Sequence, residues 1–127
     1  MVGIVVVSHN AKLAEGIKEM AEMMANGVQI AVAGGLDNGI MGTSYEKISK
    51  AVEFVCGRDG AVVIMDMGSA IMTTELVLEN LKDDEVKMAD CPLLEGTMRA
   101  AVVAASGASL AEVVAAAEET RGQKKLS

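Results

Sequence analysis

The sequence predicts an α/β domain built on a parallel sheet of about four strands, with helices on both faces. Three observations lead to this prediction. Short apolar runs recur along the chain, each is followed by a segment whose apolar residues have helical spacing, and the junctions are polar or glycine-rich. Uninterrupted apolar strands are typical of sheets covered on both faces, and alternating strands and helices form parallel sheets with right-handed crossovers.

The first strand and helix are expected at the N-terminus. The apolar run Ile4–Val7 predicts a strand, and the polar turn Ser8-His9-Asn10 ends it. A helix is expected at about Ala11–Met24, with one inward face formed by Leu13, Ile17, Met20 and Met24. Asn26-Gly27 is a typical helix end. A second strand is expected at Val28–Ala33.

A long glycine-rich loop, Gly34–Gly42, follows the second strand, and loops of this length are often functional. Thr43 and Glu46 match a capping box, which predicts that a second helix begins there. This helix is expected to turn three residues inward: Ile48, Val52 and Val55.

The third strand is expected at Ala61–Met65, after a turn at Arg58-Asp59-Gly60. It ends in Asp66-Met67-Gly68-Ser69, from which a third helix runs to about Leu81. A turn at Asp83-Asp84 then leads to a weaker fourth strand at Val86–Ala89.

Two helices complete the chain. Asp90-Cys91-Pro92 ends the fourth strand, and Leu93–Ala105 forms a helix rich in alanine and valine. A capping box, Ser109 with Glu112, opens a last helix that frays into Arg121–Ser127. No linker or repeat interrupts the sequence, so residues 1–127 are expected to form one domain.

Composition excludes several classes of function. A formal net charge of −7 argues against binding a nucleic acid. Tyr45 and Phe54 are the only aromatic residues, so stacking on a base or a flavin is not expected. No apolar run reaches the roughly 18 residues of a membrane span, and no signal peptide is evident, which predicts a cytoplasmic protein. Cys56 and Cys91 with one histidine make a poor zinc set, so we expect no metal and no cofactor.

The candidate chemistry lies where strands end. His9, the only histidine, follows the first strand and Asp66 follows the third. If these strands are neighbours, Asp66 can accept the Nδ1–H of His9 and leave Nε2 as a nucleophile. Helix starts at Gly42-Thr43 and Gly68-Ser69 offer backbone N–H groups that suit a phosphoryl group. The predicted activity is transient phosphorylation of His9.

Simpler interpretations exist for each residue. His9 could be an ordinary surface histidine, and Asp66 could only cap the following helix. Thr43 and Ser69 could be caps as well. The apolar content of 51% and the alanine-rich helix also predict a homodimer. A flat docking surface is expected around His9, bordered by Asp37–Met41 and Met67, where methionines could repack against different partners.

Four segments together resemble a known family: IVVVSHNAKLAEGI, GGLDNGIMGTS, VVIMDMGSA and ADCPLLEGTMRAAVVAASGASL. They resemble the enzyme IIA domain of the mannose-type phosphotransferase system. Within that family they are most similar to the branch that serves phosphoenolpyruvate-dependent dihydroxyacetone kinase. The resemblance covers nearly the whole chain.

The resemblance implies a strand order of 2-1-3-4 and a homodimer. It implies that His9 takes a phosphoryl group from the phosphocarrier HPr and passes it to ADP on the kinase subunit DhaL. DhaL then phosphorylates dihydroxyacetone bound to DhaK. Asp66 matches the histidine-supporting aspartate, and Thr43 and Ser69 match positions beside the phosphoryl group. Some relatives carry fused phosphocarrier domains, so we expect this single domain to use separate donor proteins.

Three rival interpretations remain at this stage. A receiver-type signalling domain would use Asp66 as phosphoacceptor, but it needs acidic residues after the first strand, where this chain has Ser8-His9-Asn10. A flavin-binding or nucleotide-binding module would need a glycine fingerprint or a P-loop, and neither is present. An enzyme IIA of a mannose-type sugar transporter would share the histidine chemistry and differ only in the acceptor.

Overall fold

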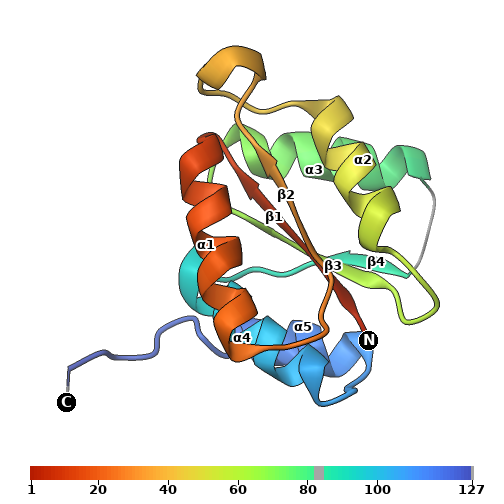
Figure 1. Cartoon of the computed structure of the whole chain (residues 1–127), viewed down its shortest axis with the longest axis vertical. Helices are drawn as coiled ribbons and strands as arrows, with labels where there is room; N and C mark the ends of the chain where they lie inside the picture. The colour runs from red at the N-terminus through yellow and green to blue at the C-terminus, as the bar shows by residue number, and fades with distance from the viewer. Residues whose placement is uncertain (82–84, 127) are drawn as a thin grey trace.

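In the part of the chain that the structure describes, four parallel strands form the centre, and five α-helices cover them in two layers (Figure 1). The computed structural model describes residues 1–81 and 85–126. The predicted turn at Asp83-Asp84 lies outside the described residues. The elements in chain order are β1 (Gly3–Ser8), α1 (Ala11–Met24), β2 (Ile30–Gly34), a 3₁₀ turn η1 (Asp37–Gly39), α2 (Tyr45–Val55), β3 (Ala61–Met65), α3 (Ser69–Leu81), β4 (Val86–Met88), α4 (Leu93–Ala105) and α5 (Leu110–Glu118).

The sheet order is β2-β1-β3-β4, which confirms the predicted fold class and strand order. β1 lies between two parallel neighbours, and its register places Val7 beside both Ala33 of β2 and Met65 of β3. The residues that follow β1 and β3 therefore emerge side by side at the carboxyl edge of the sheet.

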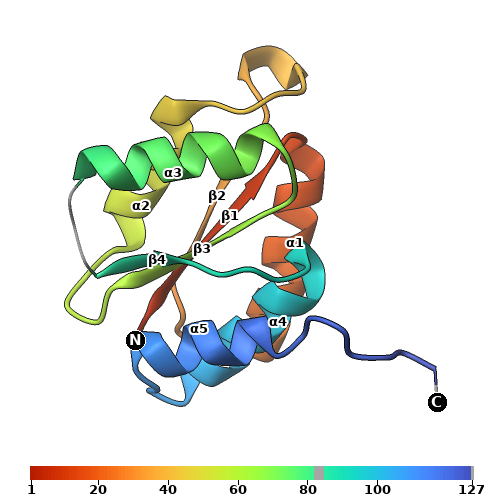
Figure 2. The same cartoon turned by 180° about the vertical axis from the view of Figure 1, so that it is seen from behind.

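Two apolar clusters hold the layers together, one on each face of the sheet. α1, α4 and α5 pack on one face through alternate β1 residues such as Ile4 and Val6. α2 and α3 pack on the other face through Val5 and Val7. Figure 2 shows α5 on the same side of the sheet as α4 and α1, with α3 on the opposite side. β1 is buried throughout, as its uninterrupted apolar sequence predicts.

The predicted inward face of α1 is wrong by about one residue. Ile17 is buried, but its companions are Ala14 and Ala21, whereas Leu13, Met20 and Met24 are 47%, 48% and 60% exposed. The first turn of α1 approaches the end of β2 closely. A Cβ added to Gly34 would lie 2.7 Å from the Cα of Ala11 and 3.1 Å from the Cβ of Ala14, so only a small side chain fits at position 14.

The predicted start of α2 is also wrong by one residue. Ser44, not Thr43, is the N-cap, and its hydroxyl accepts a hydrogen bond from the backbone N–H of Lys47 at 3.2 Å. The capping box predicted with Glu46 is therefore absent from this helix, although Ile48, Val52 and Val55 are buried as expected. The shift leaves the Thr43 hydroxyl free for another role.

The alanine-rich face of α4 does not lie on the surface. Ala100, Ala101 and Ala104 are buried in the core, so they cannot form the flat outer face expected for a dimer. The exposed apolar side of α4 instead includes Val102, which is 42% exposed. Among the described residues, no helix is both long enough and apolar enough to cross a membrane.

Candidate functional site

Three chain segments meet at the carboxyl edge of the sheet. The turn after β1 carries His9, the loop after β2 carries Thr43, and the turn after β3 carries Asp66 and Ser69. This assembly follows from the sheet order, because β1 pairs with both β2 and β3. The structure thus brings together four of the five predicted site residues: His9, Thr43, Asp66 and Ser69. The fifth, Gly68, is the residue before Ser69.

The His9 ring is oriented by the Asp66 carboxylate. His9 Nδ1 lies 3.0 Å from Asp66 Oδ1, and the two side chains are 22% and 14% exposed. Because a carboxylate only accepts, Nδ1 carries the proton of the neutral ring and Nε2 carries the lone pair. The geometry therefore presents the nucleophilic nitrogen away from the sheet.

Asp66 is held in place by hydrogen bonds at both oxygens. Oδ2 accepts from the backbone N–H of His9 at 2.9 Å and from the Ser8 hydroxyl at 3.0 Å. Oδ1 also accepts from the backbone N–H of Met67 at 2.7 Å. Burial tends to raise the pKa of Asp66, but these hydrogen bonds outweigh it and hold the pKa below its usual value. Asp66 is therefore ionised near neutral pH.

Two hydroxyls lie at the outer nitrogen of His9. Ser69 Oγ is 2.8 Å from Nε2, and Thr43 Oγ1 is 2.9 Å from Ser69 Oγ and 3.4 Å from Nε2. Since Nε2 has only its lone pair to offer, Ser69 donates to Nε2, and Thr43 donates to Ser69. These hydroxyls occupy the space in front of the nucleophile.

Glycines in the β2–α2 loop fix the backbone of the β1–α1 turn. The N–H of Gly35 donates to the carbonyl of Ser8, and the N–H of Gly42 donates to the carbonyl of His9, both at 3.0 Å. Gly35 has a φ of +64°, and an added Cβ there would lie 3.3 Å from the His9 carbonyl oxygen. Asn10 caps α1 by accepting from the N–H of Leu13 at 2.8 Å.

The simpler interpretations of Asp66 and Thr43 do not fit this geometry. Asp66 bonds to Ser8, His9 and Met67 rather than to the first turn of α3, and Thr43 is not the N-cap of α2. Ser8 is a member of the cluster that the sequence did not predict. The available signal was a hydroxyl at the last position of an otherwise apolar, fully buried strand.

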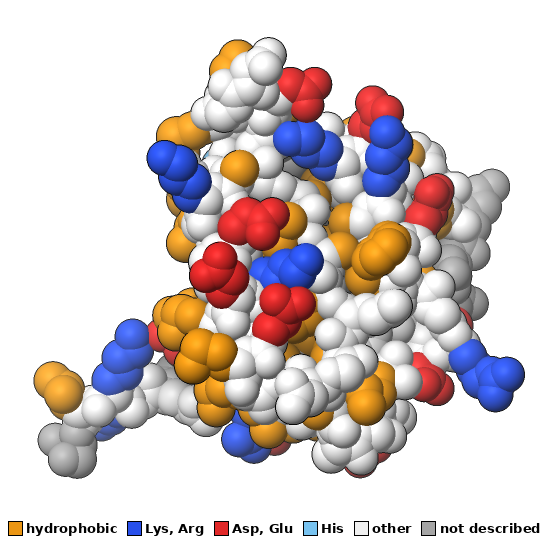
Figure 3. Space-filling view, in the orientation of Figure 1, with side chains coloured by type: hydrophobic (Ala, Val, Ile, Leu, Met, Phe, Trp, Pro, Cys, Tyr) orange, Lys and Arg blue, Asp and Glu red, His pale blue; other side chains and the backbone are white. Residues whose placement is uncertain are grey.

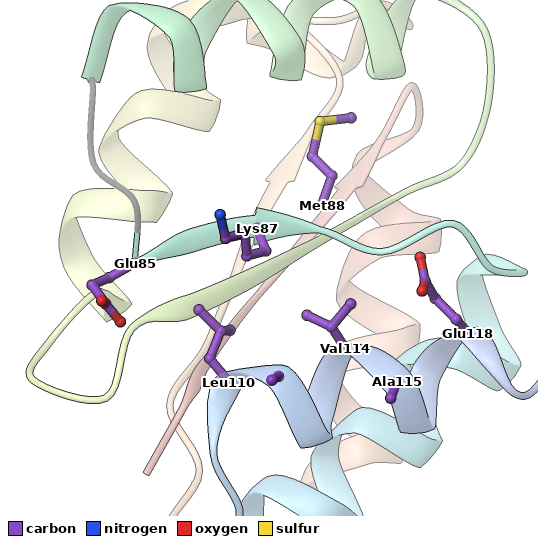
Figure 4. Close-up of a pocket in the computed structure, with 8 residues that line it drawn as sticks. Glu85, Lys87, Met88, Leu110, Val114, Ala115 and Glu118 are labelled. Atoms are coloured by element: carbon purple, nitrogen blue, oxygen red, sulfur yellow. The ribbon is translucent and has the colours of Figure 1, made fainter.

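One surface groove lies apart from this site, and a smaller recess adjoins it. A groove of about 490 Å³ lies between β4 and α5 and shares no lining residue with the His9 cluster; Leu110 and Val114 point from α5 toward β4 (Figure 4). A smaller recess of about 250 Å³ adjoins Asp66 and includes Cys91. Burial, with nearby carboxylates, raises the pKa of Cys91 to about 11, so its thiol stays protonated at neutral pH.

No group of three His, Cys, Asp or Glu side chains within residues 1–81 and 85–126 is arranged to hold a metal ion. The site is an imidazole, a carboxylate and three hydroxyls, of which those of Thr43 and Ser69 lie at Nε2 and that of Ser8 lies at Asp66. Such a group can accept and release a phosphoryl group at Nε2, because the carboxylate stabilises positive charge on the ring.

Known proteins resemble the chain over most of its length. The family model EIIA-man, described as the PTS system fructose IIA component, matches residues 3–114. The phosphoryl donor subunit DhaM of a PEP-dependent dihydroxyacetone kinase from Escherichia coli (strain K12) is 40% identical over 121 residues, which cover 90% of this chain and 26% of that protein. The chain thus spans about a quarter of the length of this relative.

Two further proteins match nearly end to end. The phosphotransferase subunit DhaM from Lactococcus lactis is 36% identical over 107 residues, covering 84% of this chain and 85% of that protein. A crystal structure titled as the unknown-function protein EF1359 superposes with a TM-score of 0.86 at 30% identity, covering 100% of both chains. The match over residues 3–114 and the end-to-end relatives establish that this chain belongs to the EIIA-man family of phosphotransferase-system IIA components.

Proposed function

We propose that this protein carries a phosphoryl group on His9, taking it from the phosphocarrier HPr and passing it to ADP bound on a DhaL-type kinase subunit. The observation that carries the proposal is the geometry of the only histidine, with Nδ1 held by Asp66 and Nε2 facing outward. The curated relatives, which are phosphoryl donor or phosphotransferase subunits of dihydroxyacetone kinases, support the choice of acceptor.

In the first transfer the Nε2 lone pair attacks the phosphorus of the donor phosphohistidine. A new P–N bond forms to His9, and the P–N bond to the donor ring breaks, with its electron pair returning to the donor nitrogen. The His9 ring becomes positively charged while Nδ1 keeps its proton. Asp66, 3.0 Å away, stabilises this charge without accepting the proton.

The two hydroxyls at Nε2 must turn to make room. Ser69 and Thr43 lie within 3.4 Å of Nε2, so a phosphoryl group bound there would meet both. Each hydroxyl can rotate and donate to a phosphoryl oxygen. The backbone at Gly68, which has a φ of +51° and precedes the first turn of α3, is a further candidate contact.

In the second transfer a terminal oxygen of ADP attacks the phosphorus and the His9 P–N bond breaks. The electron pair returns to Nε2, and the products are ATP on the acceptor subunit and neutral His9. The acceptor subunit then phosphorylates dihydroxyacetone bound to DhaK. In this scheme the present chain supplies the nucleophile and the charge stabilisation, and the acceptor holds the nucleotide.

Both partners would dock on one apolar surface around His9. Its exposed residues come from the β2–α2 loop and the start of α3, and they include Ile40, Met41, Met67, Ile71 and Met72. Flexible methionine side chains can repack against two different partners in turn. The excess of 18 acidic over 11 basic residues should favour basic partner surfaces, and salt should weaken the association.

The test is phosphorylation by phosphoenolpyruvate, enzyme I and HPr with a radioactive phosphoryl group. The label is expected to be stable in base and labile in acid, as a phosphoramidate is, and to be absent from His9→Ala. Because His9 is the only histidine, no site mapping is needed. Base-stable label on the His9→Ala protein would overturn the assignment.

The acceptor is tested separately with the phosphorylated protein. Mixing it with ADP-loaded DhaL is expected to convert the bound ADP to ATP and to remove the label from His9. If the label stays on His9 in that mixture but moves to a mannose-type transporter component, the dihydroxyacetone assignment is wrong and the histidine chemistry remains.

We also infer that the protein is a homodimer. Apolar side chains line a groove of about 510 Å³ between α1 and α4, including the exposed Met20, Met24 and Val102 and the half-buried Met98. Figure 3 shows hydrophobic side chains gathered over the lower end of α1 and over α4. A second copy of the same face would cover this surface, which supports the homodimer expected from the apolar content.

A further inference from the structure

The hydroxyl of Ser8 is buried beneath the proposed phosphorylation site. Ser8 is the last residue of β1 and is 1% exposed. Its Oγ lies 3.0 Å from Asp66 Oδ2 and 3.1 Å from the backbone nitrogen of Asn10. A buried hydroxyl with two polar partners has a fixed orientation, unlike a hydroxyl that rotates freely in water.

The direction of both hydrogen bonds follows from the partners. The Asn10 N–H can only donate, so Ser8 Oγ accepts from it. The ionised carboxylate of Asp66 can only accept, so the single Ser8 proton points to Oδ2. The Ser8 hydroxyl therefore connects the turn that carries His9 to the carboxylate that orients its ring.

We propose that Ser8 is a positioning residue for phosphoryl transfer, which rests on the proposed function of His9. Its hydroxyl holds Asp66 Oδ2 so that Oδ1 stays aimed at His9 Nδ1. Ser8 does not touch the reacting nitrogen, because its contact runs to the oxygen of Asp66 that His9 Nδ1 does not use. It acts on the nucleophile through Asp66.

Within residues 1–81 and 85–126, the side chains that hydrogen-bond the Asp66 carboxylate are the Ser8 hydroxyl and the His9 ring. The backbone N–H groups of His9 and Met67 also bind it, one at each oxygen. Removing the Ser8 hydroxyl leaves one donor fewer on Oδ2 and leaves the Asn10 N–H without its acceptor. Both changes loosen the turn and the carboxylate together, and the expected result is a mixture of His9 tautomers.

The experiment compares Ser8→Ala with wild type by two readouts. The first is the pair of ¹⁵N chemical shifts of the His9 ring, which report the tautomer and belong to a single residue because no other histidine is present. The second is the rate of phosphorylation by phospho-HPr. Ser8→Ala is expected to populate the Nε2–H tautomer and to slow phosphorylation by about tenfold.

Three further variants separate positioning from loss of stability. Thr74→Val removes another buried hydroxyl, which donates to the carbonyl of Ala70 at 2.7 Å in α3, and should change neither readout. Ser8→Thr keeps the hydroxyl and should retain the wild-type tautomer and rate. Ser8→Val has the shape of threonine without the hydroxyl, so it should populate the Nε2–H tautomer and slow phosphorylation relative to Ser8→Thr, and this pair decides the question if the alanine variant does not fold.

Two outcomes would contradict different parts of the scheme. If Ser8→Val and Ser8→Thr give the same ring shifts and the same rate, the hydroxyl does not position Asp66 and the proposal for Ser8 is overturned. If wild-type protein is not phosphorylated at all, the proposed function fails. The ring shifts of the Ser8 variants still decide whether Ser8 orients Asp66 in that case, because they are measured on the unphosphorylated protein.

Discussion

At the scale of single residues, the pairing of His9 with Asp66 determines which nitrogen reacts. A neutral histidine in water exchanges between two tautomers, and only one leaves Nε2 with a lone pair. The 3.0 Å contact between Nδ1 and Oδ1 selects that tautomer before a donor protein arrives. In the proposed transfer, the negative charge would then stabilise the ring once the phosphoryl group is attached.

Replacing Asp66 with asparagine is expected to slow phosphorylation by roughly 10²- to 10⁴-fold without abolishing it. The amide keeps the shape of the side chain but loses the charge, and its NH₂ group can favour the wrong tautomer. Single-turnover transfer from phospho-HPr measures the effect, with Asp59→Asn at an exposed aspartate as the matched control. An unchanged rate would mean that Asp66 has only a structural role.

The lowered pKa of Asp66 predicts a pH dependence of stability. Hydrogen bonds favour the charged carboxylate only in the folded state, so they stabilise the fold above the unfolded aspartate pKa of about 3.9. That contribution disappears as the pH falls through the lower pKa of the folded state. The free energies of unfolding of wild type and Asp66→Asn should therefore converge on acidification. A difference that grows toward low pH would contradict the assignment.

His9 and Asp66 were predictable because a strand end fixes where the next residue emerges. Thr43 was also predicted, from a helix start and the family resemblance, whereas Ser8 was missed, since a hydroxyl contributes only when its direction is known. For Ser8, the direction depends on the pairing of two strands 58 positions apart in sequence. A sequence pattern does not show the direction of a hydroxyl, which becomes known only from the packed structure.

At the scale of secondary structure elements, the N-terminus of α2 assigns different tasks to two adjacent residues. Ser44 caps the helix, and Thr43 faces His9 and Ser69. The sequence predicted Thr43 as the helix cap and also as a residue beside the phosphoryl group. A shift of one residue in the helix start moved Thr43 from the role of a cap into the site.

This division predicts separable effects of two substitutions. Ser44→Ala is expected to cost about 1 kcal/mol of stability and to leave the intrinsic transfer rate nearly unchanged. Thr43→Val is expected to lower the transfer rate and to change stability much less. Denaturant unfolding and single-turnover transfer, measured on both variants, test the pair. The opposite pattern would mean that Thr43 is the functional cap.

The packing of α1 shows how steric fit can override apolar periodicity. Leu13, Met20 and Met24 are more apolar than Ala14 and Ala21, yet the alanines are buried. The close approach at Gly34 explains the choice at Ala14, because a larger side chain there would push the first turn of α1 off β2. Spacing alone indicated a helix correctly but could not reveal the distance between helix and sheet.

At the scale of the whole molecule, the same packing leaves a methionine-rich surface on α1 and α4. The homodimer inferred above predicts that Met20→Glu and Val102→Glu convert a dimer into monomers, because each places a charge in the shared face. Phe54→Glu is the matched control, since Phe54 is 71% exposed on α2, across the sheet. Sedimentation at micromolar concentration distinguishes these outcomes. A wild-type protein that sediments only as a monomer would contradict the inference.

The sheet order also affects the time at which the site forms during folding. Helices can form from neighbouring residues, but His9 meets Asp66 only after β1 pairs with β3, and it meets Thr43 only when the β2–α2 loop is in place. The environment of the His9 ring therefore reports when the central sheet is complete. In a refolding experiment, the NMR signal of the His9 ring should reach its native value after the helical circular dichroism signal does. A chain whose helices have formed can therefore still have a histidine that Asp66 has not yet oriented.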